Sequence, residues 1–449
     1  MPADSPPAPA TADASEPGRS SAPGPEGPGT PPPHTGAVTG VLELLAFLRD
    51  PEFARKRFDR FGDVFETVVA GQPRVFVRGA EAMADLMSQA ADLEGWWPAS
   101  VSQLLGPFSL ANRNGESHLA RRRVVGRLFS AAALRACAPG IVRISEAVRD
   151  DLAAAAAPVA LAPWMRAFAF QVIAEEVLTL SPEGRASLFD DFEIWTRGLF
   201  SFPLALPGSP LARAKAARRR LIQRLLGLLP SLSVLADACD EAGLPLQDPD
   251  LADQLLLLLF AGYETTASAL TLAVLLLLEH PDTLAWLLEE LDTVPWPPDA
   301  NGLEQLETLP RLNAVIKEVL RLVPPVGGLF RRAKAPVRLG PWTIATGRVI
   351  QVDLRATQRD HRAFGDGDRF RPERHLETAG TAPAAANVPF GIAPRVCLGK
   401  PLAELELRLL LTRLLQSLRF SLEPDQDLTL EVIPTPRPRS GLLVRVERR

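Results

Sequence analysis

The chain has 449 residues, of which 47% are hydrophobic and 23% charged, with a formal net charge of −4 and a sequence pI of about 5.9. These values are typical of a soluble globular protein, and they exclude a wholly disordered chain, a collagen and a small disulfide-stapled scaffold. The slightly acidic balance gives no electrostatic reason to expect a nucleic-acid partner. Cys137, Cys239 and Cys397 are too far apart for a disulfide framework or a zinc motif, which favours a reducing cytoplasm.

Residues 1–36 differ in composition from the rest of the chain. Eleven prolines are interleaved there with Gly, Ala, Ser and Thr, and large apolar side chains are almost absent. Such a segment cannot bury enough surface to offset its ordering entropy. It also lacks the basic start and apolar core of a secretory signal. We therefore expect a disordered tail over 1–36, ending near Pro31–Pro33, followed by a single domain over 37–449.

Two short strands joined by a turn are the first predicted elements. Val64–Val69 and Pro73–Val77 are rich in β-branched and aromatic residues, and Gly71-Gln72 lies between them. Most of residues 79–330 then follows a helical pattern of apolar side chains that Pro and Gly interrupt. Within that region, Leu199–Pro210 is apolar and Pro-rich and predicts a loop.

The longest apolar stretch, Leu251–Leu278, would be long enough to cross a membrane. Glu264 lies near its centre, where a carboxylate opposes membrane insertion, so the pattern favours a long helix in the core of a soluble protein. Short strands are predicted again over Val337–Val352, and a strong helix over 401–418. The whole pattern predicts one large, mainly α domain with a minor β region and no transmembrane anchor.

The loop around Cys397 carries the clearest chemical signal. Two glycines and two prolines in residues 389–399 predict a tight loop that ends where the last strong helix begins. A thiolate at a helix start gains from free amide donors and from the helix dipole. Arg395 adds a cation suited to a carboxylate, and Phe390 can cover the loop. This set suits a thiolate metal ligand beside an anionic group, as in a cysteine-bound haem; the alternative is a buried, inert cysteine.

The spacing Phe390…Arg395-x-Cys397-x-Gly399 resembles the haem-binding signature of the cytochrome P450 superfamily. Four further motifs that are similar to those of this family occur in the family's order. They are His118-x-x-x-Arg122, Ala261-Gly262-Tyr263-Glu264-Thr265-Thr266, Glu318-x-x-Arg321 and Phe370-Arg371-Pro372-Glu373-Arg374. The family usually has Gly where this chain has Ala393, a departure that concerns the shape of the loop and leaves the cysteine in place.

The resemblance implies a fold as well as a cofactor. The cytochrome P450 fold is a triangular prism of helices with a minor β region. It holds haem b between the central long helix and the cysteine loop with the helix that follows it.

The resemblance also implies roles for single residues. Cys397 is the expected iron ligand, and Glu264 and Thr265 are expected to deliver protons during oxygen activation. Glu318, Arg321 and Arg374 are expected to form a buried structural network that braces the cysteine loop. The haem propionates would contact His118, Arg122, Arg395 and one of Arg331 and Arg332, of which Arg331 fits better. Phe390 and Ala261 complete the expected haem contacts.

Residues from about 40 to 446 are similar to the branch of this family that hydroxylates retinoic acid. Apolar and aromatic side chains in the corresponding stretches would fit a lipophilic substrate of isoprenoid size. The expected pocket residues are Trp97, Leu105, Phe108, Phe202, Phe260, Val326 and Leu329. Arg437 could meet a substrate carboxylate, although a structural arginine is the alternative.

The expected activity is that of a bacterial, cytoplasmic haem-thiolate monooxygenase acting on a retinoid or terpenoid-like molecule with O2. No part of the chain resembles a reductase, so electrons would come from a separate ferredoxin or flavodoxin with its NAD(P)H reductase. One alternative is a peroxygenase driven by hydrogen peroxide on fatty acids, against which Glu264 and Thr265 argue. A non-catalytic haem sensor or carrier is the other alternative.

Overall fold

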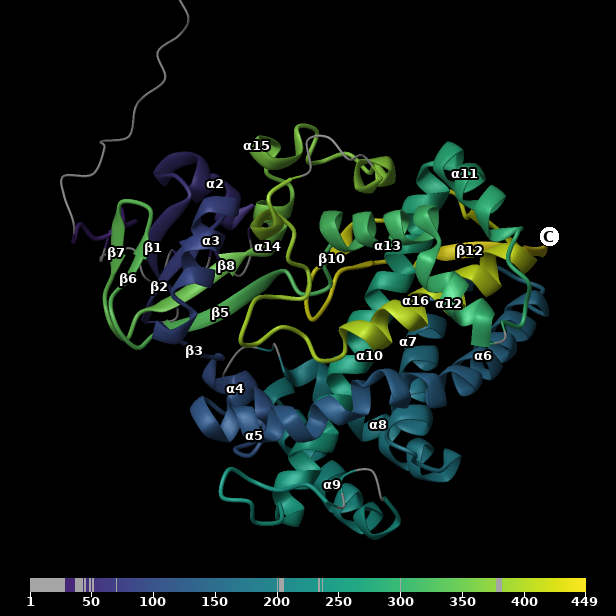
Figure 1. Cartoon of the computed structure of the whole chain (residues 1–449), viewed down its shortest axis with the longest axis horizontal. Coiled ribbons are helices and arrows are strands. Elements are labelled where there is room, and N and C mark those ends of the chain that lie inside the picture. The colour runs from purple at the N-terminus through teal and green to yellow at the C-terminus, as the bar shows by residue number, and fades with distance from the viewer. Residues whose placement is uncertain are drawn as a thin grey trace, which may run out of the picture.

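The computed structural model describes residues 29–36, 43, 46–47, 50, 52–69, 71–199, 201, 206–232, 235, 237–298, 300–376 and 382–449. In this part of the chain the fold is mainly helical with small sheets, as the sequence predicts (Figure 1). The larger helices are α2 (Phe53–Phe61), α3 (Ala80–Ser88), α4 (Ala99–Leu105), α5 (Gly115–Gly126), α6 (Ala131–Ala153), α7 (Leu161–Gln171), α8 (Pro182–Leu199), α9 (Pro210–Leu228), α10 (Asp248–Glu279), α11 (Pro281–Leu291), α12 (Ala300–Thr308), α13 (Pro310–Leu322) and α16 (Lys400–Ser417). Two short helices are α14 (Leu354–Gln358) and α15 (His361–Phe364).

The largest sheet has the strand order β1-β2-β8-β5-β3 and lies on the left in Figure 1, beside α2 and α3. Its strands are β1 (Val64–Val69), β2 (Gln72–Val77), β3 (Leu93–Gly95), β5 (Gly328–Ala333) and β8 (Val349–Asp353). The hairpin β1/β2 confirms the first two predicted strands. The strands β2 and β8 run parallel, whereas the other neighbours are antiparallel. The smaller strands are β4 (Val159–Ala160), β6 (Val337–Leu339), β7 (Trp342–Ile344), β9 (Leu418–Leu422), β10 (Leu430–Glu431), β11 (Arg437–Pro438) and β12 (Leu443–Arg448).

Residues 29–36 differ from the tail expected over 1–36. The Glu66 N–H donates to the Pro33 carbonyl at 2.8 Å, and the Thr35 N–H donates to the Glu66 carbonyl at 3.1 Å. The segment therefore pairs with β1, because an edge strand offers free backbone groups to any extended chain beside it. The ordered domain begins before residue 37, and residues 1–28 lie outside the described residues.

The central element of the helical part is α10, which spans 32 residues and packs against α7, α9, α13 and α16. It is long and apolar enough to cross a membrane, but most of it is buried inside the protein. This burial matches the core helix that the sequence favours. On one side of α10 lie the cysteine loop and α16, which starts at Lys400, directly after the predicted loop.

Candidate active site

A cavity of about 360 Å³ lies between α10, the cysteine loop and the large sheet. Its walls come from α5, α10, β5, residues 389–399 and the first turns of α16. Many of the residues singled out from the sequence line this one cavity, although they are spread over 301 positions. They are Trp97, His118, Arg122, Ala261, Thr265, Val326, Leu329, Arg331, Phe390, Arg395 and Cys397.

The Cys397 thiol is exposed to the cavity while it lies deep within the molecule. The Cys397 N–H donates to the Phe390 carbonyl at 2.9 Å, which closes the loop. Burial raises the pKa of the Cys397 thiol, although the N–H groups of Gly399 and Lys400 and the Arg122 cation favour the thiolate. The amide donors expected at the helix start are therefore present, but burial outweighs them.

The alanine that replaces the family's glycine fits the loop without backbone strain. Among the described residues, Thr179, Asp425 and Leu442 are the non-glycine positions with positive φ, so Ala393 is not one of them. The position in this loop that needs glycine is Gly391, whose φ is 79°.

Four basic side chains line the cavity, and among the described residues none of them pairs with a carboxylate. Arg122 donates to the Val396 carbonyl at 2.6 Å, Arg331 to the Phe330 carbonyl at 2.9 Å, and Arg395 to the Asn114 side-chain oxygen at 2.6 Å. These groups are His118, Arg122, Arg331 and Arg395.

The positive charges in this cluster repel one another and lower the pKa values of its members. Burial and then the neighbouring cation of Arg395 lower the pKa of Arg331 to about 10. Burial, followed by the cations of Arg395, Arg122 and Arg331, lowers the pKa of His118 to about 4. Gly95 has no Cβ, which leaves room for the Arg395 guanidinium, because a Cβ there would lie 2.3 Å from its carbon.

These residues fit a haem. Buried cations without anionic partners are costly, and the two propionates of a haem would supply the missing negative charge. The Cys397 thiol, which opens onto the same cavity, would be a suitable ligand for its iron. The apolar walls between these groups suit the flat macrocycle.

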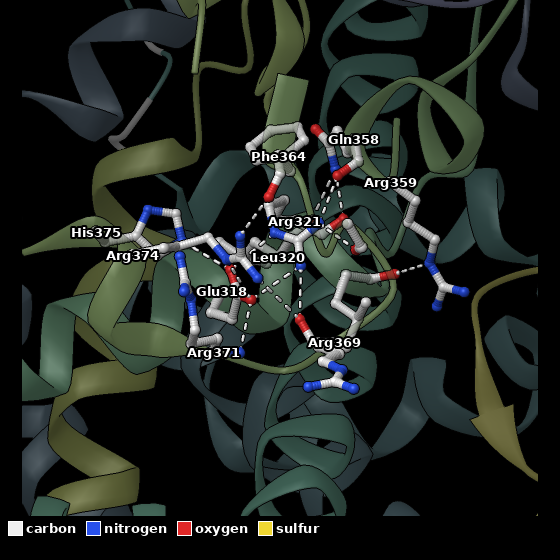
Figure 2. A network of polar contacts seen from close by, with 12 residues as sticks. Glu318, Leu320, Arg321, Gln358, Arg359, Phe364, Arg369, Arg371, Arg374 and His375 are labelled. Carbon is white, nitrogen blue, oxygen red and sulfur yellow. Dashed lines mark hydrogen bonds and ion pairs between the residues drawn. The ribbon is translucent and has the colours of Figure 1, made fainter. Parts of the chain in front are cut away.

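Figure 2 shows the network around Glu318 and Arg321, whose side chains are fully buried. The Arg321 guanidinium donates to both Glu318 oxygens, at 2.8 and 2.9 Å, and Arg374 donates to Glu318 at 3.0 Å. The predicted triad therefore exists, and His375 joins it at 2.9 Å from Glu318. Burial alone would raise the pKa of Glu318, but hydrogen bonds from Arg321 and His375 lower it to about 2.

Gln358 connects this network to the cysteine loop. Its side-chain amide donates to the carbonyls of Leu320 and Arg321, at 3.1 and 3.0 Å. Its side-chain oxygen accepts the Val388 N–H at 3.1 Å, directly before the loop begins. Sequence reasoning missed Gln358 and His375, because neither stands inside the motif that revealed Glu318 and Arg321.

Thr265 and Glu264 are neighbours on α10 but face different surroundings. Thr265 lines the cavity, and its hydroxyl donates to the Ala261 carbonyl at 2.7 Å. Glu264 is not among the described residues that line the cavity, and it is only 2% exposed. It pairs with Arg166 at 2.6 Å and accepts a hydrogen bond from Thr435 at 3.2 Å. Burial raises the pKa of Glu264, although the cations of Arg166 and Arg437 lower it.

The polar contacts of Glu264 continue toward the surface. Arg166 also pairs with Glu193 at 3.0 Å, and the Tyr263 hydroxyl donates to the same Glu193 carboxylate. Glu193 in turn pairs with the exposed Arg197 at 3.2 Å. Arg166 and Glu193 could not be found from the sequence, because they come from α7 and α8, far from the motif on α10.

Four of the residues expected in the substrate pocket are not found in the described lining of the cavity. Among the described residues, Leu105, Phe108 and Phe260 do not line this cavity, and a contact between them and a substrate stays a prediction. Leu105 is buried in the core, Phe108 is 37% exposed beneath Arg113, and Phe260 packs edge-on against Trp195. Phe202 lies outside the described residues. Other residues line the cavity without standing in a predicted motif, and they include Trp96, Leu110, Ala111, Ile173, Leu257, Leu258 and Phe330.

Arg437 does not line the cavity among the described residues. It pairs with Glu431 at 3.2 Å across β10 and β11, which favours the structural alternative.

Comparisons with known proteins agree with this geometry. The sequence model of the family "Cytochrome P450" matches residues 212–444. "Putative cytochrome P450 120" from Synechocystis is 34% identical over 429 residues, covering 92% of this chain and 96% of the relative. "Cytochrome P450 26C1" from Homo sapiens is 31% identical over 436 residues, covering 87% of this chain and 83% of the relative. The solved structure "Retinoic acid bound cyanobacterial CYP120A1" has a TM-score of 0.87 and 34% identity, covering 94% of this chain and all of the other.

Proposed function

Because the chain belongs to the cytochrome P450 family and is a monooxygenase, we propose that it hydroxylates a C–H bond of a lipophilic, retinoid or terpenoid-like small molecule. The observation that carries this proposal is the apolar and aromatic wall of Trp97, Val326 and Leu329 beside Cys397. Such a wall suits a long lipophilic molecule that few polar groups orient. The similar solved structure whose title names bound retinoic acid supports a retinoid as the first candidate.

Haem b, when bound, supplies the binding and reductive activation of O2. Cys397 would hold its iron, while His118, Arg122, Arg331 and Arg395 would hold its propionates. Phe390 lines the cavity, with the Lys400 ammonium 5.6 Å from its ring centroid, and it would cover the loop beside the sulfur. Ala261 keeps the α10 side of the cavity open, because its side chain is a single methyl group.

Thr265 and Glu264 would control the protons that the reaction consumes. The Thr265 hydroxyl faces the cavity and can hold a proton or a water molecule there. Glu264 is buried among polar groups that lead to Arg197 at the surface, so it would take a proton from the solvent side and pass it toward the Thr265 hydroxyl. A narrow polar route of this kind supplies protons while the apolar cavity excludes bulk water.

A ferredoxin or flavodoxin would deliver the electrons in the cytoplasm. Arg123 and Lys400 are exposed cations on α5 and α16, the two helices that flank the cysteine loop. Cations at this position would attract an acidic electron donor. The three free cysteines suit a reducing compartment.

The test is turnover of all-trans-retinoic acid by the holoprotein with a ferredoxin, its reductase and NADPH. We expect a product with one added oxygen atom, formed in proportion to the NADPH consumed. Oxygenation of a terpenoid acid but not of retinoic acid would exclude a retinoid as the substrate. Product formed with hydrogen peroxide alone and none with the redox partners would favour the peroxygenase alternative.

A further inference from the structure

The side chain of Gln254 on α10 pairs with the backbone of a loop that is more than a hundred positions away in sequence. Its oxygen accepts the Leu110 N–H at 2.9 Å, and its amide nitrogen donates to the Phe108 carbonyl at 2.7 Å. One acceptor and one donor therefore face alternate residues of the loop, as the backbone of a neighbouring strand would. Gln254 is only 1% exposed, so bulk water does not compete for these bonds.

A buried charge pair fixes the orientation of the Gln254 amide. Its nitrogen also donates to the Asp250 carboxylate at 2.8 Å, and Asp250 pairs with Arg121 of α5 at 2.7 Å. A carboxylate beside an arginine accepts hydrogen bonds and donates none, so it must face the amide nitrogen. The amide oxygen is then the atom left for the Leu110 N–H.

The residue beside Gln254 holds the same loop. Asp253 accepts the Phe108 N–H at 3.0 Å and pairs with Arg218 of α9. The Arg218 Nε donates to the Leu104 carbonyl, at the end of α4, at 2.9 Å. Side chains of α9 and α10 therefore hold the segment between α4 and α5 through its backbone.

The held segment forms part of the cavity wall. Leu110 and Ala111 line the cavity, and so do Leu257 and Leu258, which lie about one turn along α10 from Gln254. Gln254 itself is not among the described residues that line the cavity. Its two bonds thus set the position of Leu110 relative to α10 from behind the wall.

We propose that Gln254 is a positioning residue that fixes Leu110 and Ala111 in the cavity wall and thereby determines which shapes of lipophilic substrate fit. This inference rests on the proposed function and concerns the substrate specificity of the same site. Without the Gln254 amide, the Phe108 carbonyl and the Leu110 N–H would be buried without partners. The loop would move until these groups are paired, and the wall would lose its fixed position.

The test compares ligands that differ only in shape. Ferric holoprotein is titrated with all-trans and with 13-cis retinoic acid, and binding is followed by the change in haem spin state. We expect the two affinities of the wild type to differ by about tenfold or more. Gln254→Met, which is similar in size but has no N–H to donate, should lower this ratio by about threefold to tenfold. Gln254→Glu keeps an oxygen for the Leu110 N–H, so its ratio should fall between the two.

Ser268→Ala is the matched control. Ser268 is a buried residue of the same helix whose hydroxyl donates to the Pro436 carbonyl at 2.6 Å, and Pro436 is not among the described residues that line the cavity. This variant should leave the isomer ratio unchanged. An unchanged ratio in Gln254→Met would overturn the proposal, as would a wild type that binds both isomers equally. A similar change of the ratio in Ser268→Ala would also overturn it.

A double-mutant cycle tests whether Gln254 acts through Leu110. If it does, the effects of Gln254→Met and Leu110→Ala on the isomer ratio should not add in the double variant. Additive effects would overturn the proposal. Because the ratio compares two ligands on the same folded protein, a general loss of stability does not change it. Gln254→Glu takes the place of Gln254→Met in the cycle if the methionine variant does not fold.

A second pair of isomers separates this inference from the choice of retinoid. Oleic acid and elaidic acid, which differ in the geometry of one double bond, are titrated in the same variants. If neither retinoid binds, but the wild type distinguishes the fatty acids and Gln254→Met does not, the retinoid assignment fails and the inference stands. If the wild type hydroxylates retinoic acid and the isomer ratio is unchanged in Gln254→Met, the inference fails and the proposed function stands.

Discussion

Glu264 and Arg166 form a buried ion pair, with 2.6 Å between Oε1 and Nη2, although they are 98 residues apart in sequence. The pair connects the motif on α10 to α7, and through Glu193 to the surface. Glu264 is therefore turned toward a polar route rather than toward the cavity. Its neighbour Thr265 faces the cavity. The two residues therefore lie between the cavity on one side and the polar groups that lead to the surface on the other.

We expect Glu264→Gln to slow product formation by about 10²-fold, because an amide cannot pass on a proton. Substrate binding should be unchanged, because Glu264 does not line the cavity among the described residues. The measurement is the pH dependence of kcat with substrate affinity determined separately. Glu279→Gln, at the exposed end of the same helix, is the control. Unaltered kcat across the pH range would remove Glu264 from the proton route.

Arg166→Gln should move the pH profile. Burial raises the pKa of Glu264 and the Arg166 cation lowers it, so loss of that cation raises the pKa further. The limb of the kcat profile that reports Glu264 should therefore shift to higher pH. Arg197→Gln, which alters the exposed end of the same route, should shift the limb less. A shift to lower pH in Arg166→Gln would contradict this assignment.

Thr265→Ala should separate oxygen consumption from product formation. The hydroxyl faces the cavity, and its loss leaves the site without the group that holds a proton there. We expect NADPH and O2 to be consumed at a similar rate while the product formed per O2 falls severalfold. Thr271→Ala is matched, because its buried hydroxyl also donates to a carbonyl of α10, at 2.8 Å. Equal product yields from both variants would refute the role of Thr265.

Glu318→Gln should destabilise the fold by about 3–5 kcal/mol, because it leaves Arg321 buried with an incomplete partner. The folded-state pKa of Glu318 is about 2 and its ordinary value is 4.5, so the carboxylate stabilises the fold above pH 4.5. That contribution is lost as the pH falls from 4.5 through 2. Chemical denaturation of the holoprotein measures it, with the exposed Glu304→Gln as control. Equal stability of the two variants at neutral pH would contradict the network's role.

The contribution of Glu406 to stability should depend on pH in the opposite direction to that of Glu318. It is fully buried on α16, and among the described residues neither carboxylate oxygen accepts a well-formed hydrogen bond. Burial raises its pKa well above 4.5, and the nearby Thr266 hydroxyl only partly opposes that shift. Its contribution is present below pH 4.5 and is lost as the pH rises toward the folded-state pKa, by about 1.4 kcal/mol per pH unit. The stability of Glu406→Gln relative to wild type should therefore be greater at pH 8 than at pH 5. Denaturation at both values tests the sign.

The sequence predicts the parts of the site that short motifs carry. Cys397, His118, Arg122 and Arg395 meet at one cavity because each stands in a motif whose spacing fixes its position on a loop or helix. The long helix α10 and the hairpin β1/β2 were also predictable, since both follow clear periodic patterns. The fold class followed from the same patterns.

The rest depends on packing between distant segments. Arg166, Gln358 and His375 enter the site from elements without a motif, so only the folded chain brings them to Glu264 or Glu318. Leu105 and Phe260 were expected in the pocket because they are apolar residues of stretches that resemble the pocket-lining stretches of the family. Both pack into the core instead, because neighbouring positions of one helix face different directions.

The most direct test of the central claim is the spectrum of the reduced holoprotein with carbon monoxide, recorded for wild type and Cys397→His. A haem bound through the Cys397 thiolate predicts the strongly red-shifted band of a thiolate-ligated ferrous haem in wild type, and a band typical of histidine ligation in the variant. The same red-shifted band in both proteins would show that Cys397 is not the ligand and would contradict the account.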